Sequence, residues 1–113
     1  MSGKYWLSGY IDVMRRDDVI ARLKRSEPAL RALGVAGLYL FGSHARDEAA
    51  PHSDVDVFVD PVSEDRFGFL PFMDAYQALQ DAFDRQVDIG YSTRAGLSPY
   101  VRKDVEREAV RIF

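Results

Sequence analysis

Apolar residues recur at helical spacing in the first third of the chain. Val19, Ile20 and Leu23 fall on one helical face, and two aspartates precede them in the first turn, where carboxylates suit the helix dipole. Pro28 interrupts this helix and, at the first position of a new turn, would restart it, and Gly34 suits its end. The pattern therefore predicts an interrupted helix ahead of Gly34.

Three later segments have the patterns of strands. Val35–Phe41 is a continuous apolar run, as in a buried strand. Asp54–Val59 alternates strictly, with valines on one face and the aspartates on the other, and Val87–Tyr91 predicts a third strand. Between the first two strands, Ser43–Ala49 predicts a short helix with its serine near the N-cap.

Two further helices complete the pattern. Pro71–Asp84 carries a clear apolar stripe. A last helix is expected from Ser98-Pro99, and its apolar stripe is formed by Tyr100, Val101, Val105, Ala109 and Val110. The element order α-β-α-β-α-β-α predicts an α/β (α+β) domain in which helices cover at least one face of a small sheet.

Composition narrows the function classes. The length of 113 residues suits one domain, and a net charge of −3 argues against general nucleic-acid binding through phosphate contacts. The lack of cysteine excludes disulfides, thiolate catalysis and cysteine-based zinc sites, and it is compatible with a reducing cytoplasm. No apolar run approaches the ~20 residues that span a bilayer. Residues 1–14 lack the apolar core of a signal peptide, so we expect an N-terminal extension there and the domain at 15–113.

A glycine and a serine follow the first expected strand, at Gly42-Ser43. Glycine lets a phosphate approach the backbone closely because no Cβ intervenes. At the start of a helix, free N–H groups and the positive end of the dipole would face the same anion. Arg46, one helical turn further on, would reach that anion with its planar set of donors. The segment is a candidate phosphate site, although a plain strand-to-helix turn has the same pattern.

Three carboxylates form the second candidate group. Asp54 and Asp56 share one face of the second strand, with roughly 6–7 Å between their Cα atoms, and carboxylates this close repel each other unless a cation lies between them. Asp88 stands between apolar residues and would share that face if the third strand lies beside the second. Oxygen-only ligands suit Mg²⁺ or Mn²⁺. An edge strand with a charged outer face is the simpler alternative.

Two histidines, His44 and His52, flank this region. A two-histidine zinc centre is an alternative, but no further ligands stand at a recognisable spacing. We expect His44 to line the entrance of a nucleotide site and His52 to lie in the turn before the second strand.

Together, these motifs resemble the signature of the DNA polymerase β-like nucleotidyltransferases, and most of all their minimal nucleotidyltransferase (MNT) branch. The similar positions are Leu40-Phe41-Gly42-Ser43, Ala45, Arg46, Ser53-Asp54-Val55-Asp56, Asp60 and Val87-Asp88-Ile89. The similarity covers about Val19–Phe113. Asp47 departs from the branch, which usually has glycine there, but aspartate tolerates the left-handed conformation. The resemblance implies a small mixed β-sheet flanked by helices.

The resemblance also implies roles for the candidate residues. It assigns the metals and catalysis to Asp54, Asp56 and Asp88, and the nucleotide to Gly42, Ser43, Arg46 and Ser53. Asp88 would complete the second metal site and help to deprotonate the attacking hydroxyl. The expected cofactors are two Mg²⁺ ions, for which Mn²⁺ can substitute, and the expected substrate is ATP. Two metals about 4 Å apart stabilise the attacking and leaving oxygens of an in-line displacement.

A partner is implied by the same resemblance. The MNT branch resembles the antitoxin half of bacterial toxin–antitoxin modules, whose other half is a helical HEPN protein with ribonuclease activity. The implied function is a cytoplasmic adenylyltransferase that transfers AMP from ATP to a tyrosine of that toxin. The short stretch after Asp88 leads us to expect that another molecule supplies the acceptor surface. The alternatives are a non-catalytic module that masks its partner and a small-molecule nucleotidyltransferase.

Overall fold

The computed structural model describes residues 14–113. The expected N-terminal extension therefore lies, apart from Met14, outside the described residues. The elements are α2 (Arg16–Arg25), α3 (Glu27–Ala32), β1 (Val35–Phe41), β2 (Val55–Pro61), α4 (Phe69–Ala82), β3 (Ile89–Thr93), α5 (Arg102–Glu108) and β4 (Val110–Arg111). Among residues 14–113, no helix combines the length and apolar character needed to cross a bilayer.

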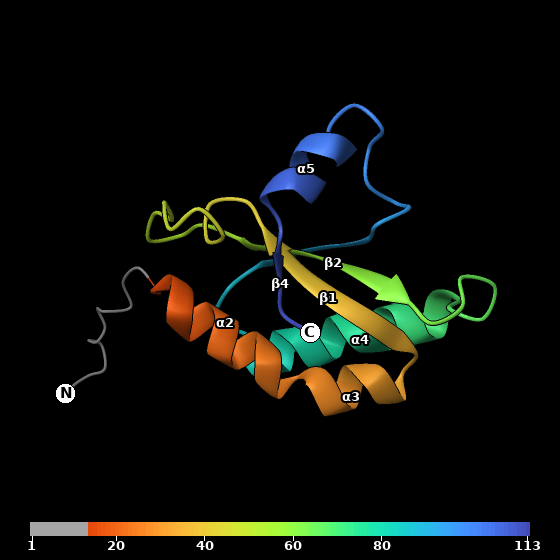
Figure 1. Cartoon of the computed structure of the whole chain (residues 1–113). Helices are drawn as coiled ribbons and strands as arrows, with labels where there is room; N and C mark the ends of the chain where they lie inside the picture. Colours follow the sequence, from red (N-terminus) through yellow and green to blue (C-terminus); the bar gives the residue numbers. More distant parts are fainter. Residues whose placement is uncertain (1–13) are drawn as a thin grey trace.

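The sheet is mixed and has the strand order β3-β2-β1-β4. β1 pairs antiparallel with both β2 and β4, whereas β2 and β3 run parallel. Helices α2, α3 and α4 cover one face of the sheet, and α5 lies on the other face (Figure 1). The small mixed sheet flanked by helices is thus confirmed.

The core lies between the sheet and the three helices on its first face. Alternation along β2 sends Val55, Val57 and Val59 into this core, where they are fully buried. Leu23 of α2 and Leu79 of α4 pack against them from the helical layer. Because successive residues of a strand point to opposite faces, burial of the valines leaves Asp56 on the face that carries α5.

On that second face, Arg94 links the sheet to α5. Its guanidinium donates to both carboxylate oxygens of Asp60, each at 2.8 Å, and to Glu106 of α5, also at 2.8 Å. It lies 4.9 Å from the ring centroid of Tyr39 and 4.8 Å from that of Phe58, within range of cation–π attraction. The Arg94 side chain thereby connects α5 to an aromatic patch of the sheet.

The helix expected at Ser43–Ala49 is wrong. The segment instead forms a hydrogen-bonded turn, in which the Arg46 and Glu48 N–H groups donate to the carbonyls of Gly42 at 3.2 Å and Ser43 at 2.8 Å. Asp47 then adopts a left-handed conformation, with φ of 58°, which stops the turn from continuing as a helix. The expectation that Asp47 tolerates this conformation in place of glycine is confirmed.

The C-terminal helix also differs from its prediction. It begins at Arg102 rather than near Ser98, and Tyr100 is 95% exposed instead of lying on a buried stripe. The backbone becomes extended at Ala109, and Val110 pairs with Leu40 as part of β4, a strand that the pattern did not predict. A strand of two residues is too short to show alternation, so only its pairing reveals it.

Arg94→Ala should lower the free energy of unfolding by about 1–3 kcal/mol, because it removes a two-oxygen ion pair and a cation–π contact that are partly shielded from solvent. Urea unfolding followed by circular dichroism measures this. Arg107→Ala is the matched control, since the Arg107–Asp104 pair has 73% of each side chain exposed. It should change stability by less than about 0.5 kcal/mol. Equal effects of the two substitutions would contradict the role of Arg94.

Candidate active site

The predicted carboxylates gather at one end of the sheet, where β2 and β3 begin. Asp54 and Asp88 each lie one residue before their strand rather than within it, a small correction to the predicted strand bounds. The Val55 N–H donates to the Asp88 carbonyl at 2.9 Å, and Val55 pairs with Ile89. Because β2 and β3 run parallel, this register sets Asp54 beside Asp88, at the ~4.8 Å spacing of neighbouring strands.

The same register assigns the three carboxylates to one face. Ile89 is buried in the core, so the residues on either side of it, Asp88 and Gly90, belong to the opposite face. Gly90 pairs with Asp56, which also faces away from the core. Parallel pairing of β2 and β3 therefore brings Asp54, Asp56 and Asp88 to one end and one face of the sheet.

The carboxylate of Asp56 lies between two glycines. A Cβ at Gly42 would collide with one of its oxygens and lie 3.2 Å from its Cγ. A Cβ at Gly90 would collide with the other oxygen and lie 3.4 Å from the same Cγ. Gly42 is further constrained by a φ of 79°, which side chains rarely tolerate. Sequence reasoning overlooked Gly90, because a glycine inside a strand shows its purpose only once the neighbouring strand is known.

The surroundings of Asp56 make its negative charge less favourable than it is in water. Partial burial raises the pKa of Asp56 above its ordinary range, and the negative charge of Asp54 raises it further. The positive charge of Arg46 acts in the opposite direction. A carboxylate held in this way gains stability from a bound cation, because a cation offsets both the lost solvation and the repulsion.

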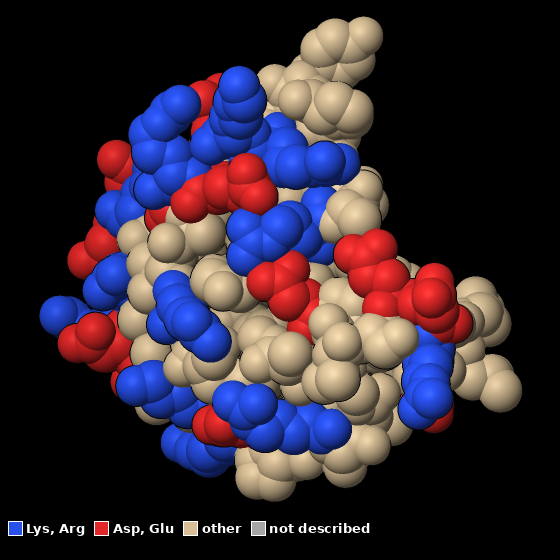
Figure 2. Space-filling view, turned by 45° about the vertical axis from the view of Figure 1, so that its right-hand side comes forward, with Lys and Arg blue, Asp and Glu red and all other residues tan. Residues whose placement is uncertain are grey.

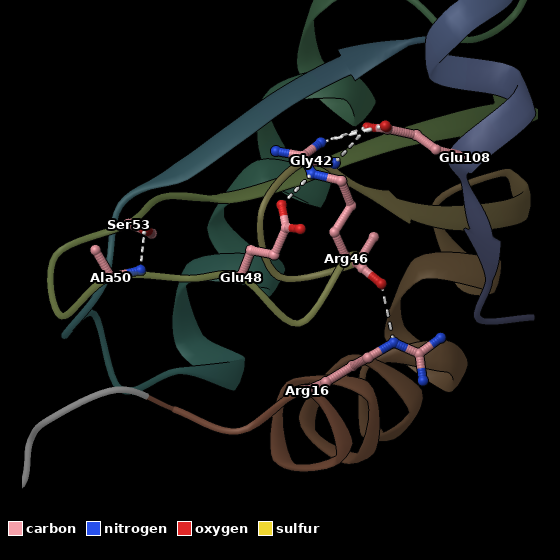
Figure 3. Close-up of polar contacts among 8 residues, drawn as sticks. Arg16, Gly42, Arg46, Glu48, Ala50, Ser53 and Glu108 are labelled. Carbon is pink, nitrogen blue, oxygen red and sulfur yellow. Dashed lines mark hydrogen bonds and ion pairs between the residues drawn. The ribbon is translucent and has the colours of Figure 1, made fainter.

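The loop between β1 and β2 is held in place by side chains (Figure 3). Arg16 of α2 donates through Nε to the Ala45 carbonyl at 3.0 Å. At the far end of the loop, the Ala50 N–H donates to the Ser53 hydroxyl oxygen at 2.8 Å, which closes a turn directly before Asp54. The loop therefore has a defined shape without a helix, and its position depends on α2.

Two hydrogen-bond donors of this loop bind the same carboxylate, that of Glu108. The Gly42 N–H donates to Glu108 Oε1 at 3.1 Å, and an Arg46 guanidinium nitrogen donates to both carboxylate oxygens, at 3.1 and 3.2 Å (Figure 3). Arg46 also donates through Nε to Glu48 at 3.0 Å. The backbone and side-chain donors that the sequence assigned to phosphate thus converge on a carboxylate.

The sequence pattern that describes the nucleotidyltransferase domain matches residues 21–112 of this chain. The chain belongs to the nucleotidyltransferase domain family. A curated relative from Methanocaldococcus jannaschii, named "Putative protein adenylyltransferase MJ0126", is 30% identical over 81 residues, which are 69% of this chain and 76% of the relative. The protein is therefore a transferase by family, and its relatives include proteins named for adenylyl transfer to protein.

Solved structures agree with this assignment. A structure described as "Structure of putative minimal nucleotidyltransferase" has a TM-score of 0.72 and 29% identity, over 86% of this chain and 95% of that one. A second, "Crystal structure of the toxin-antitoxin with AMP-PNP", has a TM-score of 0.62 and 19% identity, over 80% of this chain and 72% of that one. The first supports the minimal nucleotidyltransferase branch, and the second shares the fold.

The three aspartates of this nucleotidyltransferase are chemically suited to a divalent metal, but they are not arranged around one ion in advance. Their carboxylate oxygens are the ligands that Mg²⁺ prefers. Asp54 and Asp88 are exposed, whereas Asp56 is half-buried. Within the part of the chain that the structure describes, no three acidic or histidine side chains are already arranged around one ion position. Like-charge repulsion favours such an open arrangement, and substrate phosphates are common additional ligands of Mg²⁺.

The two histidines have different surroundings. His44 is only 4% exposed, so the expectation that it lines the nucleotide entrance is wrong. Its Nε2 lies 3.4 Å from the Ser53 carbonyl, and it therefore packs beneath the loop. His52 is exposed in the turn before β2, as expected. Within residues 14–113, no group of metal-binding side chains supports the two-histidine zinc alternative.

An open recess of about 480 Å³ lies at the opposite end of the sheet, where β1 begins and β2 ends. Its lining includes Arg31, Gly34, Val62 and Arg66 and none of the predicted site residues. The candidate active site is therefore the exposed end of the sheet where β2 and β3 begin, and not this recess.

Gly90→Ala should lower transferase activity roughly a hundredfold, the order expected when a reacting group is misplaced by about 1 Å. The added methyl would rotate the short Asp56 side chain away, so the fold should survive and the thermal midpoint should change little. Gly68→Ala is the matched control, because a Cβ there meets nothing within 4 Å. Similar activity losses in the two variants would contradict the steric role of Gly90.

Asp56→Asn should raise the thermal midpoint of the metal-free protein at pH 7 by on the order of a few degrees. Because the pKa of Asp56 is raised on folding, the stability gained from protonating it is fully present below its ordinary pKa of 3.8 and is lost as pH rises through the folded-state pKa. The advantage of asparagine should therefore be largest at neutral pH and vanish below 3.8. Calorimetry across this pH range measures it, and a large loss of stability at pH 7 would show that Asp56 is structural.

Proposed function

We propose that this nucleotidyltransferase is a Mg²⁺-dependent protein adenylyltransferase that acts as an antitoxin. It would transfer AMP from ATP to a tyrosine hydroxyl of a helical, HEPN-type toxin. The cytoplasm, which supplies ATP, is the compartment we expect for this reaction.

The observation that carries the proposal is the placement of Asp56 between Gly42 and Gly90, beside two further carboxylates and two converging anion donors. A metal and a phosphate chain need these two kinds of ligand next to each other. Asp54 and Asp56 would hold Mg²⁺, with Asp88 completing a second position. Mg²⁺, when bound, stabilises charge on the attacking and leaving oxygens of the displacement.

The residues of the chain would perform the remaining tasks. The Gly42 N–H, the Ser43 hydroxyl and the Arg46 guanidinium would orient the β- and γ-phosphates, and Ser53 would support the same end of the nucleotide. The acceptor oxygen then bonds to the α-phosphorus while the bond from that phosphorus to the bridging oxygen breaks. Pyrophosphate leaves, and Asp88 takes the hydroxyl proton before passing it to solvent. Positioning and electrostatics supply the rate, because the chain contributes no covalent intermediate.

A protein acceptor suits the shape of the site. Asp54 and Asp88 are exposed at the edge of the sheet, where a side chain carried by another protein can approach. The relative named for protein adenylylation and the toxin–antitoxin structure that shares the fold support this choice. Nucleic acid is a weaker acceptor candidate, because Lys and Arg are interspersed with Asp and Glu on the face in Figure 2 and the net charge is −3.

Asp88→Asn should still bind the toxin but no longer modify it. The substitution removes one charge from an exposed position, so complex formation should survive while proton removal fails. Intact-mass spectrometry of a co-expressed or purified HEPN-type partner, incubated with ATP and Mg²⁺, reads the result directly. Wild type should add one or more AMP units, and the variant none.

Asp74→Asn is the matched control, because it removes one exposed carboxylate from α4, away from the site. It should transfer AMP as well as wild type does. Protection by Asp88→Asn at substoichiometric dose would contradict a catalytic antitoxin. A partner whose mass never changes with wild type, yet is neutralised at equal dose, would favour a masking module. AMP transfer only to small hydroxyl compounds would favour a small-molecule transferase.

A further inference from the structure

Glu108, the last residue of α5, occupies the donors that the proposed function assigns to phosphate. Its carboxylate accepts from the Gly42 N–H at 3.1 Å and binds Arg46 through both oxygens, at 3.1 and 3.2 Å. A carboxylate that accepts from a backbone N–H and a guanidinium in this way imitates a phosphate oxygen pair. No local sequence pattern indicates this contact, because 66 residues separate Glu108 from Gly42.

The position of Glu108 is set by the fold on both sides. Before it, Glu106 is held by Arg94, which also binds Asp60 of β2. After it, Val110 pairs with Leu40 of β1, and the Ile112 N–H donates to the Leu38 carbonyl at 2.8 Å. The backbone of Glu108 is therefore tethered beside the end of β1, so its carboxylate stays close to Gly42 whether or not the contact is made.

Two anions cannot use the same donors at once. A triphosphate that reaches the Gly42 N–H and Arg46 must displace the Glu108 carboxylate, and the displaced charge remains near the phosphates because of the tether. We propose that Glu108 is a built-in competitor of the nucleotide, an autoinhibitory contact that lowers the affinity of this site for the triphosphate. The inference rests on the proposed function for the identity of the ligand, but it concerns binding and not transfer.

The expected size of the effect follows from the exposure of the pair. Arg46 has 45% and Glu108 33% of its side chain exposed. Ion pairs this exposed change an equilibrium by at most about fivefold, and the hydrogen bond from Gly42 adds a comparable factor at most. Removing the competitor should therefore tighten nucleotide binding by about three- to tenfold.

Glu108→Gln tests the proposal. The probes are Mg²⁺ with AMP-PNP, a non-hydrolysable ATP analogue, and inorganic tripolyphosphate, each titrated into wild type and variant by isothermal calorimetry. The variant should bind both probes about three- to tenfold more tightly. Glu108→Asp, which keeps the charge but shortens the reach, should also bind more tightly and shows that contact, not net charge, is responsible.

Asp104→Asn is the matched control, because Asp104 lies on the same helix and pairs with an arginine, Arg107, but this exposed pair does not join α5 to the sheet. It should leave both affinities within about twofold. Unchanged or weaker binding by Glu108→Gln would overturn the proposal and show that Glu108 positions Arg46 for the phosphate. Equal tightening by both variants, or no binding of either probe to any form, would overturn it as well. AMP transfer to the partner is read separately, so tighter binding without transfer would reject only the proposed function.

Discussion

Steric room for one carboxylate is the constraint on which the candidate site depends. Asp56 lies on β2, between the end of β1 and the start of β3, and it has a glycine on either side, Gly42 and Gly90, whose missing Cβ atoms leave space for its oxygens. Gly42 thereby has two tasks, since the same lack of a side chain opens its N–H to an anion. The metal-binding and phosphate-binding parts of the proposed site consequently share one backbone position.

The electrostatics at this end of the sheet follow from the closeness of its carboxylates. Asp54, Asp56 and Asp88 bring negative charge to one side of the sheet, and Glu108 adds more from α5. Within this group Arg46 pairs with Glu108, and it also binds Glu48. A metal–nucleotide pair would supply cations to the aspartates and an anion to Arg46, so binding of the two parts should be cooperative.

The parts of the fold and site that sequence could predict are those with local periodicity or a motif. The apolar run predicts Val35–Phe41 with its observed bounds, and the alternation of β2 correctly places the valines in the core. The pattern wrongly predicts a helix after Gly42, because short turns and first helical turns are similar in composition. Gly90 and Glu108 could not be found in this way, because their importance comes from strand pairing and from a contact across 66 residues.

Metal and nucleotide are proposed to bind at the end of the sheet that carries Asp56. Paramagnetic broadening measures this directly, by adding Mn²⁺ and AMP-PNP to ¹⁵N-labelled protein and recording amide resonances. We expect the amides of Gly42, Asp56 and Gly90 to broaden first, and only weakly when Mn²⁺ is added without the nucleotide. Broadening centred on the recess near Gly34 and Arg66, or spread without a centre, would contradict the site.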